Sequence, residues 1–186
     1  MNLAIHDHPL PYVEALPERA AAEVVRVVIH CTELPDLASA REYGEKVLHA
    51  SGTGNSGHYY IDRDGAIHRY VPGTRIANHV RGCNPDSIGI ELVNLGRYPD
   101  WWDSHHQQMT EAYPDAQISA LRRLLAQLRH EFPNLREIAG HEDLDTEKIP
   151  ASDAPARQVQ RKLDPGPLFP WSEVLRDSGL VRHNEG

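Results

Sequence analysis

Residues 24–30, Val24-Val25-Arg26-Val27-Val28-Ile29-His30, form a short β-branched run that ends in a histidine. A run of this kind predicts a buried strand, with His30 at its carboxyl end. Ligands of mixed and parallel sheets tend to bind beside the carboxyl ends of the strands. We therefore expect this strand to belong to the core of the fold and His30 to lie at the edge of the sheet where ligands tend to bind, although a histidine satisfied by a backbone carbonyl is the favoured explanation for His30 taken alone.

Helices and strands alternate along the rest of the chain. A helix over 115–131 is predicted by apolar residues at three- and four-residue steps, from Ile118 to Phe132. Other helices are expected from Asp36 or Ser39 to about His49, and from Pro170 to Gly179. Strands are expected in a hairpin over 58–71, at 87–93 and at 138–139, with loops over 51–57, 96–114 and 142–163.

This order of elements predicts an α/β fold. The hairpin must be antiparallel, so a single domain with a central mixed β-sheet flanked by α-helices is the natural arrangement. The main domain is expected over 24–180. Residues 1–23 contain three prolines and no sustained period, which indicates a loosely packed N-terminal arm, and 181–186 are expected to be a C-terminal tail.

Composition excludes several classes of protein. The chain has 186 residues, of which 40% are hydrophobic and 25% charged, as is ordinary for a globular domain. Its net charge of -8 argues against nucleic-acid binding, which needs a basic face, and against docking to an anionic membrane.

Location in the cell is read from the apolar segments and the cysteines. No stretch approaches the roughly 20 apolar residues of a membrane span, so no transmembrane segment is expected. The N-terminus lacks the basic and apolar regions of a signal peptide, which favours a cytoplasmic protein. Export by a leaderless route, or a phage or effector lysin, is the alternative. Cys31 and Cys83 form no zinc-type cluster, and a single bridge between them stays open.

His30, His141 and Asp164 are candidate metal ligands. Taken singly, each has an ordinary structural explanation, such as a histidine bonded to a backbone carbonyl or an aspartate in a turn before proline. Together, two imidazoles and one carboxylate suit Zn²⁺ and leave one coordination position for water. Spacing alone leaves the set open, because other histidines compete on composition: His58, His68, His79, His105 and His106.

Glu91 and Lys162 are candidate catalytic groups. Strand alternation places Glu91 opposite its apolar neighbours, where it is either solvent-facing or an acid–base group beside the metal. Lys162 lies two residues before Asp164, and in an extended segment both side chains point the same way. Its ammonium could stabilise an oxyanion, although most lysines are simply solvated.

Five segments of the chain, in order, resemble the type-2 N-acetylmuramoyl-L-alanine amidase family. They cover about residues 24 to 175, and five matches in order make a chance similarity improbable. The segments are Val28-Ile29-His30-Cys31-Thr32, the stretch 57–65 that begins Gly57-His58-Tyr59-Tyr60, Ser87-Ile88-Gly89-Ile90-Glu91-Leu92, Gly140-His141-Glu142-Asp143 and Lys162-Leu163-Asp164-Pro165-Gly166-Pro167.

The resemblance implies a zinc amidase domain over 24–180, with the fold of the peptidoglycan recognition proteins. It implies His30, His141 and Asp164 as zinc ligands. The aspartate as third ligand resembles the AmpD and AmiD branches of the family, whereas many other relatives carry a cysteine at this position. The implied reaction is hydrolysis of the amide between the muramoyl lactyl group and L-alanine in peptidoglycan or in muropeptides, during cell-wall recycling or degradation.

The resemblance also implies roles for residues around the metal. Glu91 is the implied acid–base group, because Gly57 stands where other branches place a tyrosine. Lys162 is implied to hold the oxyanion. The implied substrate contacts are His58, His79 and Asn84, although Asn78 replaces the tryptophan that usually precedes the histidine matching His79. Trp101 and Trp102 either stack on a sugar or cover the sheet.

Two rival interpretations remain beside the amidase. The first is a non-catalytic peptidoglycan-binding module of the same fold, and the second is a metal-free structural protein with incidental histidines. The sequence leaves open whether the substrate is an anhydro-muropeptide or intact peptidoglycan, and which stem peptide is preferred. It does not fix the oligomeric state, for which a monomer is the default expectation.

Overall fold

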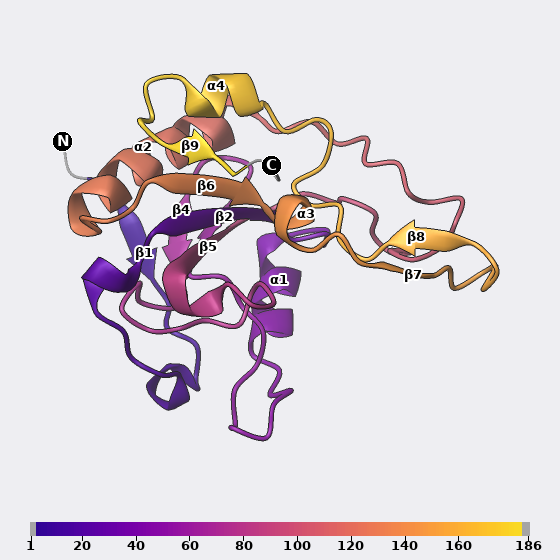
Figure 1. The fold of residues 1–186 in the computed structure, drawn as a ribbon, viewed down its shortest axis with the longest axis horizontal. Helices are drawn as coiled ribbons and strands as arrows, with labels where there is room; N and C mark the ends of the chain where they lie inside the picture. The colour runs from indigo at the N-terminus through magenta and orange to yellow at the C-terminus, as the bar shows by residue number, and fades with distance from the viewer. Residues whose placement is uncertain (1–2, 184–186) are drawn as a thin grey trace.

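A mixed sheet forms the centre of the computed structural model, which describes residues 3–183 (Figure 1). Within these residues the sheet has seven strands in the order β1-β4-β3-β5-β2-β6-β9. The strands are β1 (Ile5–Asp7), β2 (Arg26–Cys31), β3 (Tyr59–Ile61), β4 (Ile67–Arg69), β5 (Ser87–Leu92), β6 (Glu137–Gly140) and β9 (Val181–Arg182). β7 (Lys148–Pro150) and β8 (Gln158–Gln160) pair separately from this sheet.

Helices flank the sheet on both faces. The α-helices are α1 (Leu37–Gly44), α2 (Asp115–Glu131), α3 (His141–Leu144) and α4 (Trp171–Leu175), and the 3-10 turns are η1 (Val13–Ala15), η2 (Ala21–Glu23) and η3 (Asn84–Asp86). The main core joins one face of the sheet to the buried side of α2 and to α4. A second cluster joins the other face to α1 and to the segment around η1. The expected α/β architecture with a mixed sheet is therefore confirmed.

The strand at 24–30 has the central position that its apolar residues require. β2 lies between β5 and β6 and runs parallel to both, while β3 and β4 form the expected antiparallel hairpin. In the β2–β5 ladder, His30 stands opposite Glu91. Because facing residues of neighbouring strands point to the same side of a sheet, these two side chains share one face near the carboxyl ends of the strands.

The N-terminal arm is not loosely packed. β1 adds a parallel edge strand to β4, and Leu10, Tyr12, Val13 and Leu16 are buried in the second cluster. The sequence showed no period here because the burial is achieved by single anchors along an irregular chain. β9 likewise adds residues of the expected tail to the sheet, whereas 184–186 lie outside the described residues. The domain boundaries 1–23, 24–180 and 181–186 stay a prediction, and in the described residues the packing is continuous across both of them.

Three expected elements differ in extent. The first helix begins as predicted, with Asp36 accepting a hydrogen bond from the Ser39 N–H, but it ends at Gly44 rather than near His49. The last helix ends at Leu175, before Gly179. Residues 142–163, expected to be a loop, contain most of α3 and the β7–β8 ladder, which extends away from the sheet in Figure 1. These elements are too short for periodicity to show.

Two sequence-based expectations concern cysteines and membranes. Cys31 and Cys83 are both free thiols, so the bridge between them that was left open is not formed. In the part of the chain that the structure describes, no helix combines the length and the apolar character that crossing a bilayer requires.

Candidate metal centre

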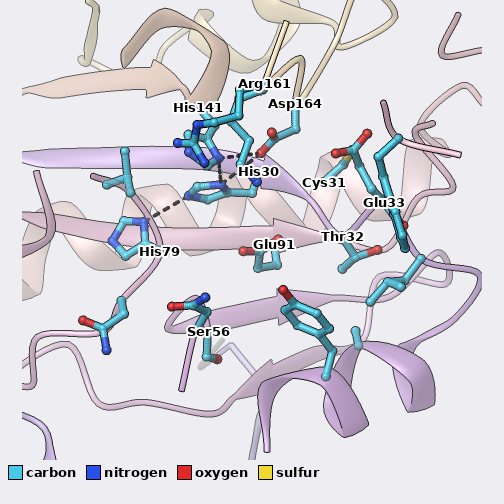
Figure 2. A pocket seen from close by; sticks show the side chains of 18 of the residues that line it. His30, Cys31, Thr32, Glu33, Ser56, His79, Glu91, His141, Arg161 and Asp164 are labelled. Atoms are coloured by element: carbon cyan, nitrogen blue, oxygen red, sulfur yellow. Dashed lines mark hydrogen bonds and ion pairs between the residues drawn. The ribbon is translucent and has the colours of Figure 1, made fainter. Parts of the chain in front are cut away.

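His30, His141 and Asp164 converge although they come from three segments. His30 is on β2, His141 begins α3 directly after β6, and Asp164 lies beyond β8. Nδ1 of His30 lies 3.0 Å from Nδ1 of His141, and Oδ2 of Asp164 lies 3.0 and 3.1 Å from these two nitrogens. All three residues are buried, and their ligand atoms form the one candidate metal group found within residues 3–183 (Figure 2).

The three atoms fit a zinc ion. Ligand atoms about 2.1 Å from a tetrahedral zinc stand roughly 3.4 Å from one another, a few tenths of an ångström more than the separations of 3.0 to 3.1 Å seen here. Oδ1 of Asp164 is buried without a hydrogen-bond partner among the described residues, which leaves a carboxylate oxygen with unused capacity for a cation. The donor set therefore suits the metal that the sequence predicted.

The protonation states also suit a metal. Burial, with the neighbouring His141 second, lowers the pKa of His30 to about 4, so its imidazole is neutral near pH 7. Burial alone would raise the pKa of Asp164, but the neighbouring His141, with Lys162 beside it, holds that pKa well below its usual range. A neutral imidazole and an ionised carboxylate are the forms that bind zinc.

Glu91 lies on the same face of the sheet, beneath His30 in Figure 2. Burial, reinforced by the charge of Asp164, raises its pKa to about 8 in the metal-free protein. Gly57 makes room for this side chain, since a Cβ on Gly57 would stand 2.8 Å from Cγ of Glu91. Gly57, which replaces the tyrosine of other branches of the family, thus leaves space for the side chain of Glu91.

A cavity of about 550 Å³ opens over these groups. Glu91 and Lys162 line it together with His30, His141 and Asp164, and the positive charge of Lys162 opposes the rise in the pKa of Glu91. Trp101 and Trp102 line it as well. Trp101 donates from its indole nitrogen to the carbonyl oxygen of Glu33, whereas Trp102 is about half exposed to solvent.

His58 does not belong to the cavity. Its side chain is fully buried, with Nδ1 accepting from the Gly89 N–H and Nε2 3.0 Å from the carbonyl oxygen of Arg75. Burial and then the charge of Arg19 lower its pKa to about 3. Its position in the core excludes the substrate contact that the resemblance implied.

His79 and Asn84 line the cavity, where the ring nitrogens of His79 and the side-chain oxygen of Asn84 already have partners in the protein. The Asn84 side-chain oxygen accepts from the backbone N–H groups of His79 and Val80. His79 contacts His30 and Ser87 through its ring nitrogens, and burial lowers its pKa well below the usual value.

Arg97 is a structural residue of the site that sequence reasoning missed. It forms a buried ion pair with Glu33, at 2.7 Å, and donates to the carbonyl oxygens of Gln160 and Arg161. It thereby ties the end of β2 to the segment that carries Lys162 and Asp164. A buried arginine in a polar stretch has no local sequence signal, because its partners are distant in the chain.

The sequence model of the N-acetylmuramoyl-L-alanine amidase family matches residues 20–167. The chain is similar to the 1,6-anhydro-N-acetylmuramyl-L-alanine amidase AmpD of Escherichia coli K12, at 33% identity over 126 residues, which is 63% of this chain and 55% of that protein. The chain thus spans about half the length of this curated relative.

Solved structures agree with the fold. AmiD from E. coli, in complex with anhydro-N-acetylmuramic acid-L-Ala-D-γ-Glu-L-Lys, superposes with a TM-score of 0.64 at 25% identity, over 88% of this chain and 60% of that one. LysC from Clostridium intestinale URNW gives a TM-score of 0.68 at 20% identity, over 96% and 99% of the two chains, and supports the fold alone. Since the family model matches residues 20–167, well over half of the chain, the chain belongs to the type-2 N-acetylmuramoyl-L-alanine amidase family.

Proposed function

We propose that this protein is a zinc-dependent amidase that hydrolyses the bond between the muramoyl lactyl group and L-alanine. The observation that carries the proposal is the convergence of His30, His141 and Asp164 beneath a cavity that also contains Glu91 and Lys162. Family membership and the muropeptide bound in the E. coli AmiD structure support the same bond as substrate.

The residues of the cavity divide the chemistry between them. A zinc ion held by the three ligands would supply Lewis-acid activation of the amide carbonyl and of water. Glu91 accepts a proton from the attacking water and donates it to the departing amide nitrogen. Lys162 places a positive charge where the carbonyl oxygen becomes negative, a role usually worth a few kcal/mol of transition-state stabilisation.

Zinc binding is tested by metal analysis of the purified protein. We expect about one equivalent of zinc in the wild type and a large loss of zinc in Asp164→Ala. Asp153→Ala is the matched control, because Asp153 bonds to Ser104 outside the cavity lining and should keep its zinc. Equal zinc content in both variants would exclude Asp164 as a ligand.

Activity is tested by following the release of peptide with a free L-alanine amino group. Zinc-loaded protein is incubated with an anhydro-muropeptide and, separately, with intact peptidoglycan, and the two rates identify the preferred substrate. We expect peptide release from at least one of the two substrates. This release should stop when a chelator removes the zinc and resume when zinc is added back. Binding of a muropeptide without any release by the zinc-loaded protein would instead identify a non-catalytic binding module.

A further inference from the structure

A chain of hydrogen bonds runs from His30 to the backbone at residue 83. Nε2 of His30 lies 3.0 Å from Nδ1 of His79, a contact drawn as a dashed line in Figure 2. Nε2 of His79 lies 3.2 Å from the Ser87 hydroxyl, which donates to the carbonyl oxygen of Cys83 at 2.6 Å. This series of hydrogen bonds connects His30, a proposed zinc ligand, to the carbonyl oxygen of Cys83, which can only accept a hydrogen bond.

The direction of every bond follows from the last one. A backbone carbonyl only accepts, so the single hydroxyl hydrogen of Ser87 is directed to Cys83. The Ser87 oxygen must then accept from Nε2–H of His79. A neutral His79 that carries its hydrogen on Nε2 has a bare Nδ1, which accepts from Nε2–H of His30. Nδ1 of His30 is left without a hydrogen, and it faces His141 and Asp164.

We propose that His79 is a positioning residue of the metal site, which holds His30 in the one tautomer that offers Nδ1 to zinc. This inference rests on the proposed function, because it assumes that His30 binds a metal. Partners of this kind fix the tautomer and the orientation of metal-binding histidines in general. Here the partner is a second histidine, whose own tautomer is set by Ser87.

The protein holds the His79 ring in place from two directions. Its backbone N–H is bonded to the side-chain oxygen of Asn84, at 3.0 Å. Its ring packs against Gly89 of β5, where a Cβ would stand 2.6 Å from Cγ of His79. Any larger residue at 89 would displace the ring, so the glycine in the strand is explained by this close approach.

This placement argues against a substrate contact through the His79 ring. Both ring nitrogens already have partners, in His30 and Ser87, so neither is left to bond a sugar or a peptide. The two roles lead to different expectations. A substrate contact would alter KM and leave zinc affinity unchanged, whereas a positioning residue would alter zinc affinity in the absence of any substrate.

Zinc affinity of three variants tests the proposal without an activity assay. His79→Phe keeps a ring but removes the acceptor, and we expect its zinc Kd to rise by about 10- to 100-fold. His79→Asn retains an oxygen near the position of Nδ1 and should recover most of the loss. Ser87→Ala removes the acceptor for His79 and should weaken zinc binding in the same direction. His105→Phe, at an exposed loop position, is the matched control and should bind zinc normally.

The tautomers are measured directly by nitrogen-15 NMR of the histidine rings. We expect His79 to be neutral with its hydrogen on Nε2, in the wild-type protein with and without zinc. A hydrogen on Nδ1 of His79, or a His79→Phe protein that folds and binds zinc as tightly as wild type, would overturn the proposal. If His79→Phe does not fold, the wild-type tautomer and Ser87→Ala decide the question. A wild-type protein that binds no zinc would refute the proposed function itself, and is thus a separate outcome.

Discussion

Among single residues, Glu91 has the environment that most clearly suits proton transfer. Its carboxyl group lies beneath His30 with the backbone of Gly57 close against its stem, and burial raises its pKa to about 8. A bound zinc ion would lower that pKa again, because a nearby positive charge favours the ionised form. A carboxyl group with a pKa near neutrality can both take up and release a proton at physiological pH.

Replacing Glu91 by glutamine should separate metal binding from turnover. Glu91→Gln keeps the shape of the side chain and removes the exchangeable proton, so we expect normal zinc content with kcat lowered by about 10²- to 10⁴-fold. Zinc content and peptide release are measured on the same preparation. Turnover within a few-fold of wild type in the zinc-loaded variant would show that another group moves the proton.

The same substitution should alter the pH dependence of stability in the metal-free protein. The pKa of Glu91 is raised in the folded state, so ionising Glu91 disfavours folding as pH rises from about 4.5 through 8. In chelator, Glu91→Gln should match wild type near pH 4 and exceed its free energy of unfolding at pH 8, on the order of a few kcal/mol. Urea unfolding at several pH values measures the difference, with the exposed Glu131→Gln as control. Parallel pH curves for wild type and Glu91→Gln would contradict the shift.

Individual site residues were predictable where a motif carried them. His30, His141, Asp164, Glu91 and Lys162 lie in short segments with family-like order, and the structure brings all five to one cavity. His58 was expected to contact the substrate, but its ring is buried and does not line the cavity. A motif position does not show whether a side chain points into the core or into the cavity. Ser87 lies in one of these segments and Arg97 in none of them, but the role of neither residue was predicted, since each depends on partners that only the folded chain brings near.

Among the elements, α2 provides the largest continuous share of the core. Its apolar stripe was predictable because seventeen residues give enough turns for a helical period to appear. β1, β7, β8 and β9 have two or three residues each, so alternation has no length over which to repeat. Their positions depend on pairing with strands elsewhere in the chain.

Truncating a buried residue of α2 should destabilise the domain without altering the site. Leu124 is fully buried against the sheet, so Leu124→Ala removes apolar contacts and leaves a cavity, at a cost of about 2–5 kcal/mol. The neighbouring exposed Arg123→Ala should change the free energy of unfolding by less than about 0.5 kcal/mol. Chemical denaturation compares the two variants. Similar values for both would mean that α2 is not anchored through this face.

At the scale of the whole molecule, the site depends on segments distant in sequence. β2, the start of α3 and the segment after β8 each supply one of the three proposed metal ligands, and Arg97 and Glu33 connect two of these segments. The sequence predicted the mixed sheet that brings strand ends together. It could not predict how the irregular chain around η1 or the segment after β8 would pack, because neither has a repeating pattern.

The separation of the ligands along the chain has a kinetic consequence. His30 and His141 are 111 residues apart, and we expect their contact to form late in folding because closing so long a loop costs entropy before the contact stabilises the chain. A site completed after the folding barrier stabilises the native state without stabilising the transition state. Zinc should therefore lower the unfolding rate constant in urea by about the factor by which it raises the equilibrium constant for folding, and leave the folding rate constant unchanged. Stopped-flow fluorescence with and without chelator measures both rate constants. Zinc would then extend the lifetime of the folded protein without helping the sheet to form.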